Sequence, residues 1–318
     1  MFEHILIPLD GSTLAECVLP HGLSVAKALA AQATLMQVVE QTKTAGRTQA
    51  IDPLEWHYSQ AEAKSYLEEV AERLREEGLP TDQALLEGDP AERVVDYCQA
   101  KKADLILVSS HGRSGLSGWN VSSVVQKILA RAHVSVLLIP AYQPTPGELS
   151  GLRYRRILVP LDGSQRAECV LPLAAALAAA HESQVLFTHM VRKPELPRQA
   201  PPSREDQALV DALTERNHHE AGRYLEELRS RLPIKAEIRL LVGDHVAATL
   251  QQQALQENVD LILLSAHGLS GGTRWPYGSL TTSFLLYGDR PLLIVQDLPW
   301  QVIRPSTAEL AVKEYGHH

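Results

Sequence analysis

The chain has 318 residues, 45% of them hydrophobic, and its 30 Lys and Arg against 38 Asp and Glu give a formal net charge of −8. This length suffices for two domains of about 150 residues, each able to bury a core. No apolar run approaches the roughly 20 residues of a membrane-spanning helix, and no basic region with a cleavage site opens the chain, so we expect a cytoplasmic protein. The basic residues are interspersed, which argues against nucleic-acid binding and favours a small ligand or a protein partner.

The chain carries one sequence pattern twice. Residues 5–12 read Ile-Leu-Ile-Pro-Leu-Asp-Gly-Ser and residues 157–164 read Ile-Leu-Val-Pro-Leu-Asp-Gly-Ser, with Ala-Glu-Cys-Val-Leu-Pro shortly after each. The two aspartates are 152 residues apart, whereas a later pair of Ser-x-His-Gly loops is 156 residues apart. Two homologous domains, with four residues inserted between these landmarks, explain the repetition.

The first copy alternates short apolar runs with stretches of helical periodicity. In chain order, the pattern predicts strand 5–9, helix 13–31, strand 33–39, helix 57–77, strand 82–87, helix 90–101, strand 104–108, helix 121–131 and strand 134–139. Gly78 is placed to cap the end of the second helix, and Asp89 precedes Pro90 as an N-cap. Strands that alternate with helices predict a parallel sheet with helices on both faces.

The second copy repeats this order. Its strands are predicted at 156–161, 184–190, 235–242, 260–264 and 291–295. We therefore predict an α/β chain of two homologous doubly wound domains, each a five-stranded parallel sheet, at 1–140 and 155–297. Residues 141–155 contain Pro and Gly without periodicity and are interpreted as the linker, while the tail after 297 has no assignment.

The loops after the first and fourth strands are the candidate functional segments, because ligands bind at the carboxyl ends of such strands where the winding direction reverses. Asp-Gly-Ser stands at 10–12 and 162–164 after the first strands. Ser-x-His-Gly stands at 109–112 and 265–268 after the fourth, and a helix is predicted to begin after nine more residues. Glycine lets the backbone approach a phosphate, and a helix N-terminus attracts negative charge, so an anionic ligand suits these loops.

These residues resemble the universal stress protein family, whose ATP-binding members carry Gly-x2-Gly-x9-Gly-[Ser/Thr] after strand four and an aspartate at the end of strand one. The resemblance covers nearly the whole chain, which looks like a tandem member. It implies a nucleotide-binding stress-response regulatory module that binds ATP, alone or with Mg²⁺, and whose output is conformational rather than catalytic. It also implies that the domains pair about a pseudo-twofold axis through their fifth strands, and it is compatible with a homo-oligomer and an unknown protein partner.

The two copies match the family motif to different degrees. Ser109 and Ser265 replace the first glycine, and Ser122 replaces the third, whereas Gly278 retains it. If a replaced glycine needs positive φ, serine costs about 1 kcal/mol and its Cβ blocks the approach of a phosphate. The second domain is therefore the better ATP-site candidate.

The resemblance implies a set of adenine-nucleotide contacts in each domain. In domain 2 they are Asp162, Met190, Leu264, Ser265, Gly268, Gly278, Ser279 and Leu280. The weaker set of domain 1 is Asp10, Val38, Val108, Gly112, Ser122 and Ser123. No catalytic or metal-ligating residue is predicted, and ATP, AMP and other adenosine compounds stay open as ligands.

Several alternatives stay open. Asp-Gly-Ser alone is also a turn followed by a helix N-cap, the loop histidines His111 and His267 are as well explained by bonds to nearby backbone, and the equivalent Trp119 and Trp275 by packing. Nucleotide-independent action through assembly is the main alternative function. A serine hydrolase using Ser270 is more remote, because its Gly-x-Ser-x-Gly segment does not pass directly into a helix. No Walker motif is present, and no enzyme is predicted.

Overall fold

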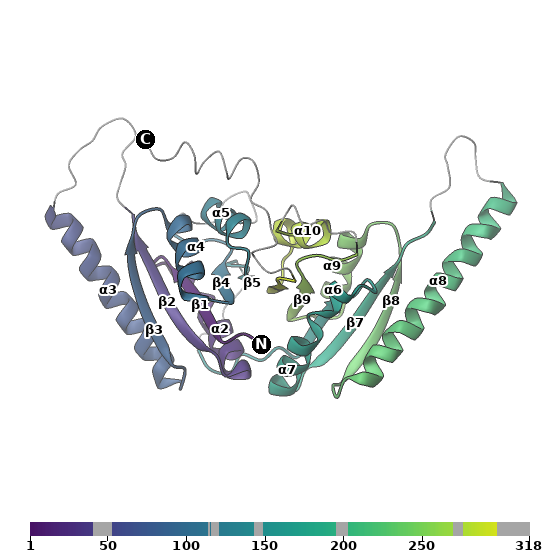
Figure 1. Cartoon of the computed structure of the whole chain (residues 1–318), viewed down its shortest axis with the longest axis horizontal. Helices are drawn as coiled ribbons and strands as arrows, with labels where there is room; N and C mark the ends of the chain where they lie inside the picture. Colours follow the sequence, from purple (N-terminus) through teal and green to yellow (C-terminus); the bar gives the residue numbers. More distant parts are fainter. Residues whose placement is uncertain are drawn as a thin grey trace.

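The computed structural model describes residues 1–40, 53–113, 115, 121–142, 149–194, 203–269 and 276–297. It confirms an α/β fold of two similar halves that lie side by side (Figure 1). Domain 1 contains β1 (His4–Leu9), α1 (Thr13–Glu16), α2 (Leu19–Leu29), β2 (Gln32–Val39), α3 (Pro53–Glu76), β3 (Thr81–Glu87), α4 (Pro90–Lys101), β4 (Leu105–Ser109), α5 (Ser123–Arg131) and β5 (Ser135–Ile139). Domain 2 repeats the order with β6 (Arg156–Pro160), α6 (Gln165–Glu168), α7 (Leu171–His181), β7 (Gln184–Val191), α8 (Arg204–Arg231), β8 (Ala236–Val242), α9 (Val246–Gln256), β9 (Leu261–Ser265), α10 (Ser279–Tyr287) and β10 (Leu292–Val295).

The strands of both domains form one continuous sheet rather than two. Its order is β3-β2-β1-β4-β5-β10-β9-β6-β7-β8, and neighbouring strands are parallel except at the centre. There β5 pairs with β10 antiparallel, and Leu137 lies opposite its repeat equivalent Leu293. The pseudo-twofold axis therefore passes between these two leucines, and the pairing leaves neither fifth strand as an exposed edge.

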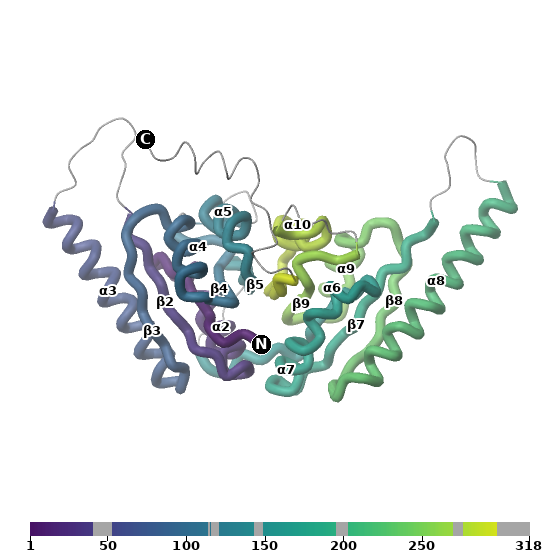
Figure 2. The backbone as a smooth tube through the Cα atoms, in the orientation of Figure 1, coloured from purple at the N-terminus to yellow at the C-terminus, as the bar shows by residue number. Residues whose placement is uncertain are grey.

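Two hydrophobic cores cover the two faces of this sheet, and each runs through both domains. One core packs α2, α3, α7 and α8 against the sheet, and the other packs α4, α5, α9 and α10 against the opposite face. The long helices α3 and α8 lie on the two outer flanks (Figure 2). Because each core is shared, the domains are joined by packing as well as by strand pairing.

The first predicted helix, 13–31, is wrong as a single element. The chain forms the short α1, turns at Cys17 and Val18, and starts α2 at Leu19 with Pro20 in its first turn. Proline lacks the N–H that an uninterrupted helix would need there, and its ring would clash with the carbonyl four residues earlier. Apolar periodicity continued across this break and concealed it. The helix predicted to begin at residue 57 begins at Pro53.

Two predicted caps are present. Gly78 has φ of +81° and donates its N–H to Arg75 O at 2.8 Å, while Leu79 N–H reaches Leu74 O at 3.0 Å, so glycine ends α3 in the left-handed conformation. The Asp89 side chain accepts the N–H of Glu92 at 3.0 Å and begins α4.

The end of the predicted linker is part of the core, which the sequence prediction missed. Tyr154 is 1% exposed, and its hydroxyl lies 2.7 Å from Nδ1 of His21 on α2. Its ring also meets the ring of His181 on α7 edge-on, with the centroids 5.4 Å apart. Tyr154 therefore packs the linker against both α2 of domain 1 and α7 of domain 2.

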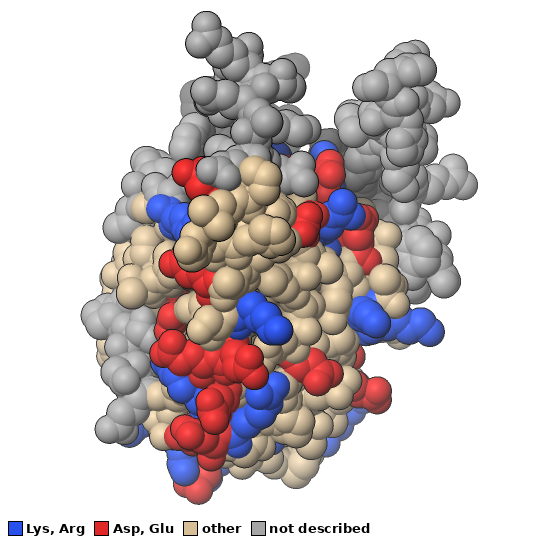
Figure 3. Space-filling model, turned by 90° about the vertical axis from the view of Figure 1, so that its left-hand side faces the viewer, with Lys and Arg blue, Asp and Glu red and all other residues tan. Residues whose placement is uncertain are grey.

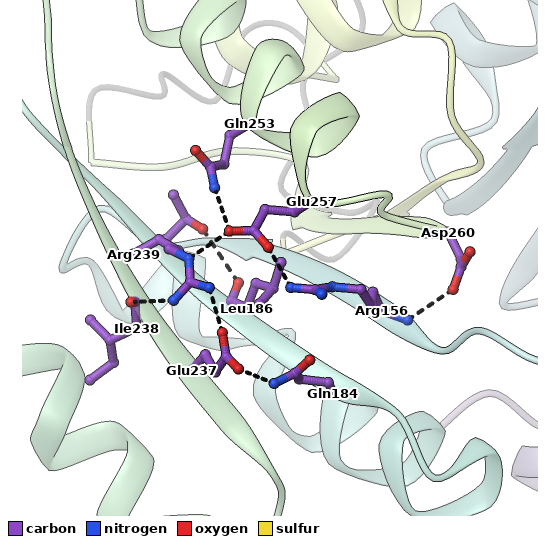
Figure 4. Close-up of polar contacts among 10 residues, drawn as sticks. Arg156, Gln184, Leu186, Glu237, Ile238, Arg239, Gln253, Glu257 and Asp260 are labelled. Carbon is purple, nitrogen blue, oxygen red and sulfur yellow. Dashed lines mark hydrogen bonds and ion pairs between the residues drawn. The ribbon is translucent and has the colours of Figure 1, made fainter.

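An ion-pair network distinguishes domain 2 (Figure 4). The Glu257 carboxylate accepts hydrogen bonds from Arg239 Nε at 2.8 Å and from Arg156 Nη2 at 2.5 Å. In domain 1 the positions that match Arg239 and Glu257 hold Ala84 and Lys101. The network ties β6, β8 and α9 together at the end of the sheet away from the loops that follow β6 and β9.

The charges on the domain 1 flank are mixed. Figure 3 shows acidic and basic side chains intermingled on this face, without a broad basic area. Among the described helices, none combines the length and the apolar character needed to cross a membrane.

Candidate functional site

The predicted site residues of each domain gather at the carboxyl edge of the sheet. The β1–β2 register sets Leu9 opposite Gln37, so Asp10 and Val38 follow as neighbours at the strand ends. In domain 2, Pro160 lies opposite Thr188, which sets Asp162 beside Met190 in the same way. The fourth strands end at this edge too, because β4 and β9 lie directly beside β1 and β6.

The aspartate after the first strand joins two loops. Asp10 Oδ1 accepts the N–H and the hydroxyl of Ser12 at 3.0 and 2.6 Å, while its Oδ2 accepts the N–H of Arg113 at 2.5 Å. Asp162 does the same with Ser164 and, at 2.6 Å, with the N–H of Leu269. The turn-and-cap alternative is confirmed as geometry, because Ser12 and Ser164 cap α1 and α6. The carboxylates in addition fix the loops that follow β4 and β9.

The second glycine of the motif is required by space, not by backbone conformation. A Cβ on Gly112 would stand 2.0 Å from Asp10 Oδ2, and one on Gly268 would stand 2.2 Å from Asp162 Oδ2. Neither glycine has positive φ. The aspartate therefore lies directly against the Cα of the glycine about a hundred residues later, and any side chain there would displace it.

The serine at the first motif position is not strained, contrary to the reasoning from φ. Ser109 and Ser265 are the last residues of β4 and β9 and do not belong to the residues with positive φ. The Ser109 hydroxyl donates to His111 O, and the Ser265 hydroxyl donates to His267 O, both at 2.5 Å. Each serine thus holds the start of its loop.

The two domains differ at the third motif position. Ser122 has φ of −65° and its side chain accepts the N–H of Val125 at 3.4 Å, so it is an ordinary N-cap of α5. Gly278 has φ of −73°, and α10 has no side-chain cap. Serine at this position therefore carries no backbone strain, and the expected cost of about 1 kcal/mol is wrong. The difference lies in chemistry, because α5 is capped by its own chain and α10 leaves its first N–H groups without a side-chain acceptor.

The remaining predicted contacts surround this edge. Val108 and Leu264 are buried near the ends of β4 and β9, and Met190 is half-buried at the end of β7. The first turns of α5 and α10 bring Ser123, Ser279 and Leu280 to the same edge. Trp119, Trp275 and Ser270 lie outside the described residues.

The loop histidines are anchored differently in the two domains. His267 Nδ1 lies 2.8 Å from Asp297 Oδ1, and the other oxygen of Asp297 accepts Arg166 Nε at 2.5 Å. In domain 1, Nδ1 of His111 meets the Ser110 hydroxyl at 3.1 Å instead. Asp297 and Arg166 were missed by sequence reasoning, because neither belongs to the repeated motif. Both of these ring contacts are with side chains, whereas the alternative from the sequence named nearby backbone.

Hydrogen bonds keep both site carboxylates of domain 2 ionised. Burial alone would raise the pKa of Asp162, but the bonds donated by Ser164 and by Leu269 N–H outweigh it and lower the pKa below its usual range. Burial likewise opposes the ionisation of Asp297, yet the bonds from His267 and Arg166 lower its pKa. Negative charge is thus fixed beside the loop that follows β9.

Several buried polar atoms of domain 2 have no hydrogen-bond partner in the described part of the chain, and two of them lie on residues adjacent to predicted site residues. They are Nδ1 of His189, the neighbour of Met190, and the hydroxyl of Tyr277, the residue before Gly278. The matching residues of domain 1 are Gln37, whose Oε1 likewise has no partner among the described residues, and Val121. Buried polar groups are normally paired, so these atoms are candidates for contact with a ligand or water. Within the described ranges, no cluster of three or more His, Cys, Asp or Glu could hold a metal ion.

Comparison with known proteins agrees with this arrangement. The profile of the universal stress protein family matches residues 1–140 and again 153–296. A universal stress protein of Methanocaldococcus jannaschii is 29% identical over 145 residues, which cover 44% of this chain and 82% of that protein. One from Thermus aquaticus is 30% identical over 145 residues, covering 44% of this chain and 99% of its own. The solved structure of an Archaeoglobus fulgidus universal stress protein shares the fold over 93% of this chain and 98% of its own, with a TM-score of 0.66 at 18% identity. The chain therefore belongs to the universal stress protein family, with two of its domains in tandem.

Proposed function

We propose that this protein is a nucleotide-responsive regulatory module that binds ATP at the carboxyl edge of domain 2, with a conformational rather than a catalytic output. The observation that carries the proposal is the difference between Gly278 and Ser122. The first N–H groups of α10 have no side-chain acceptor, whereas Ser122 supplies one to α5. Uncapped N–H groups and the positive end of a helix favour a phosphate.

The space at Gly278 fits this role. A Cβ on Gly278 would meet Ala266 O at 3.5 Å and His267 Cα at 3.6 Å, which is ordinary contact distance. The chain therefore does not need glycine here for packing or for φ. We attribute the glycine at position 278 instead to a ligand that approaches the backbone closely.

The other site residues contribute different kinds of contact to the proposed ligand. Met190 and Leu264 offer apolar surface to an adenosine, His189 and Tyr277 offer polar atoms, and the backbone at Gly278 and Ser279 holds phosphate oxygens. A Mg²⁺ ion would be held mainly by the phosphates and water, as Mg²⁺ commonly is. Nucleotide supplies negative charge and an aromatic base, and the chain supplies fixed donors.

The proposed conformational output depends on the two loops that Asp162 joins. Its carboxylate joins the loop after β6 to the loop after β9, and the latter begins with the Gly268 segment. A ligand that binds better to one arrangement of these loops than to another shifts their populations and so alters a partner surface. Action through assembly without nucleotide is the competing function, and association of chains is compatible with either.

The decisive experiment exchanges the third motif residues. Calorimetric titration of nucleotide-stripped full-length protein with Mg-ATP is expected to give about one equivalent, with Gly278→Val weakening the affinity by at least about tenfold, or about 1.4 kcal/mol. Ser122→Val, the matched variant, should leave this binding unchanged. Gly278→Ser should weaken it less than Gly278→Val does, and Ser122→Gly should add a second, weaker site in domain 1.

Two results would sink the proposal. One is the absence of binding at about millimolar Mg-ATP, which would favour the nucleotide-independent alternative. The other is loss of binding in Ser122→Val but not in Gly278→Val, which would move the site to domain 1. Esterase turnover that disappears in Ser270→Ala would instead establish the hydrolase.

A further inference from the structure

A cavity of about 280 Å³ lies between the two domains, far from the loops of the proposed nucleotide site. It is lined by α2, by the linker at 149–153 and by the end of α7. Helices α2 and α7 end just before β2 and β7 begin, so the cavity stands at the amino ends of the strands. Figure 1 shows α2 and α7 at the bottom of the view, away from α5 and α10.

Two cationic side chains, Lys27 and Arg153, line this cavity. Among the described residues, no carboxylate lies within ion-pair distance of Arg153. Lys27 pairs with Glu77 at 3.5 Å, and the Lys27 side chain is 47% exposed, so this pair leaves the ammonium accessible. Arginine favours planar anions because its guanidinium can donate two parallel hydrogen bonds.

A buried imidazole completes the polar wall. His181 is 7% exposed, lines the cavity, and has an Nε2 atom without a partner in the described part of the chain. Burial lowers the pKa of His181, and the positive charge of Arg153 lowers it further. The ring is thus uncharged at neutral pH and can donate one hydrogen bond without adding positive charge.

Part of the cavity lining is apolar. Leu23 of α2 and Leu149 and Leu152 of the linker contribute hydrocarbon surface. A wholly polar anion would leave this surface without a partner, whereas an anion on a short apolar body would cover it. The volume is close to the lower end of small-molecule pockets, which begin at roughly 300 Å³.

The chain builds this set of side chains once. The repeat equivalent of Lys27 is Ala179 and that of His181 is Leu29, so the matching positions cannot form a second copy. Arg153 comes from the linker, which a single domain would lack. The cavity is therefore a product of the tandem arrangement.

We propose that this cavity binds a small organic anion, a carboxylate or phosphate on a short apolar body, through Arg153, Lys27 and His181. Such a ligand contacts both domains and the linker at once. It therefore stabilises their present arrangement, by an amount that grows with the logarithm of its concentration above Kd, independently of nucleotide.

The test uses full-length protein with benzoate and phenyl phosphate as probes and neutral benzamide as the comparison compound. Binding is followed by calorimetry and by ligand-observed NMR in wild type, Arg153→Gln and the neighbouring Arg155→Gln, whose side chain is exposed outside the cavity lining. We expect Arg153→Gln to weaken both anions by about tenfold and Arg155→Gln by less than about twofold.

Three outcomes would overturn the proposal. They are equal binding of benzamide and benzoate, equal binding of the anions to wild type and Arg153→Gln, and no binding of either anion at about 20 mM. A Mg-ATP titration of the same variants keeps the two sites distinct, because Arg153→Gln should leave nucleotide affinity unchanged. Failure of one proposal then leaves the other standing.

Discussion

Replacing Gly268 with alanine is expected to lower the free energy of unfolding by about 2 to 4 kcal/mol. The reason is overpacking against a carboxylate that cannot move away without losing a hydrogen bond. The new Cβ would stand 2.2 Å from Asp162 Oδ2. Asp162 is held in place by bonds from Ser164 and Leu269, so relief of the clash breaks at least one of them. The loops after β6 and β9 would separate, and Mg-ATP binding should weaken with the loss of stability.

A double-mutant cycle tests this explanation. Removing the carboxylate in Asp162→Ala removes the atom against which the Cβ clashes, so the two substitutions together should cost about 1 to 3 kcal/mol less than the sum of the single ones. Urea unfolding of the four proteins gives the coupling. Gly243→Ala is the matched control, because its Cβ would meet its nearest atoms at 3.7 Å. An additive cycle, or a Gly268→Ala cost equal to that of Gly243→Ala, would contradict the proposed contact.

The same cycle can be repeated with Gly112 and Asp10 in domain 1. A Cβ there would stand 2.0 Å from Asp10 Oδ2. The expected loss of stability is similar, but nucleotide binding should persist if domain 2 holds the ligand. The pair of cycles thus separates the structural role of this contact, common to both domains, from the binding proposed for one.

Acidification from pH 6.5 to about 4 is expected to reduce the free energy of unfolding by up to about 3 kcal/mol through His21 alone. Burial lowers the pKa of His21 from 6.5 to about 4. The unfolded chain therefore binds a proton at higher pH than the folded one. The stabilisation is complete above pH 6.5 and is lost as the pH falls towards the folded value.

Urea unfolding on both sides of this window measures the effect. His21→Leu should be less stable at neutral pH, because the Tyr154 hydroxyl loses its partner, yet it should lose less stability on acidification than wild type. Part of the pH dependence of stability should remain in this variant, because burial also lowers the pKa values of His181 and His189. His218→Gln, on the exposed side of α8, should retain the full slope. Identical slopes in wild type and His21→Leu would contradict the assignment.

The carboxylates act in a different pH range. The lowered pKa values of Asp162 and Asp297 mean that the folded state keeps both ionised when the unfolded chain, with values near 3.8, begins to take up protons. Their contribution is therefore present above about pH 4 and lost below it. The histidine and carboxylate phases of acid unfolding should appear in that order.

Several features of the fold were readable because their causes are local. Gly78 and Asp89 end and begin helices through bonds to residues within a few positions, and both were predicted. Pro20 is equally local, but the apolar periodicity of 13–31 hid its effect. The gathering of the candidate site residues at the carboxyl edge was also predictable, because parallel strands bring the loops that follow them to the same edge.

The reasons for individual site residues needed the structure. Gly112 and Gly268 were matched to a motif by sequence, yet what demands glycine is an aspartate about a hundred residues earlier in the chain. Ser122 was expected to be strained, and its φ of −65° shows an ordinary cap. The bonds among Asp297, Arg166 and His267 join three separate segments, and no repeat or spacing marks them.

The duplication, the alternation of strands and helices, the family resemblance and the difference between the two motifs at Gly278 could all be read from the residues alone. The pairing of the fifth strands was implied by the family resemblance, and the register of β5 with β10 confirms it. The structure was needed to show that Tyr154 joins the linker to both domains and that a cavity with Arg153 forms between them. This division comes from the range over which the interactions act. Periodicity and capping depend on residues within one or two turns, whereas an interface depends on where distant segments return to one another, and composition and spacing do not encode that distance.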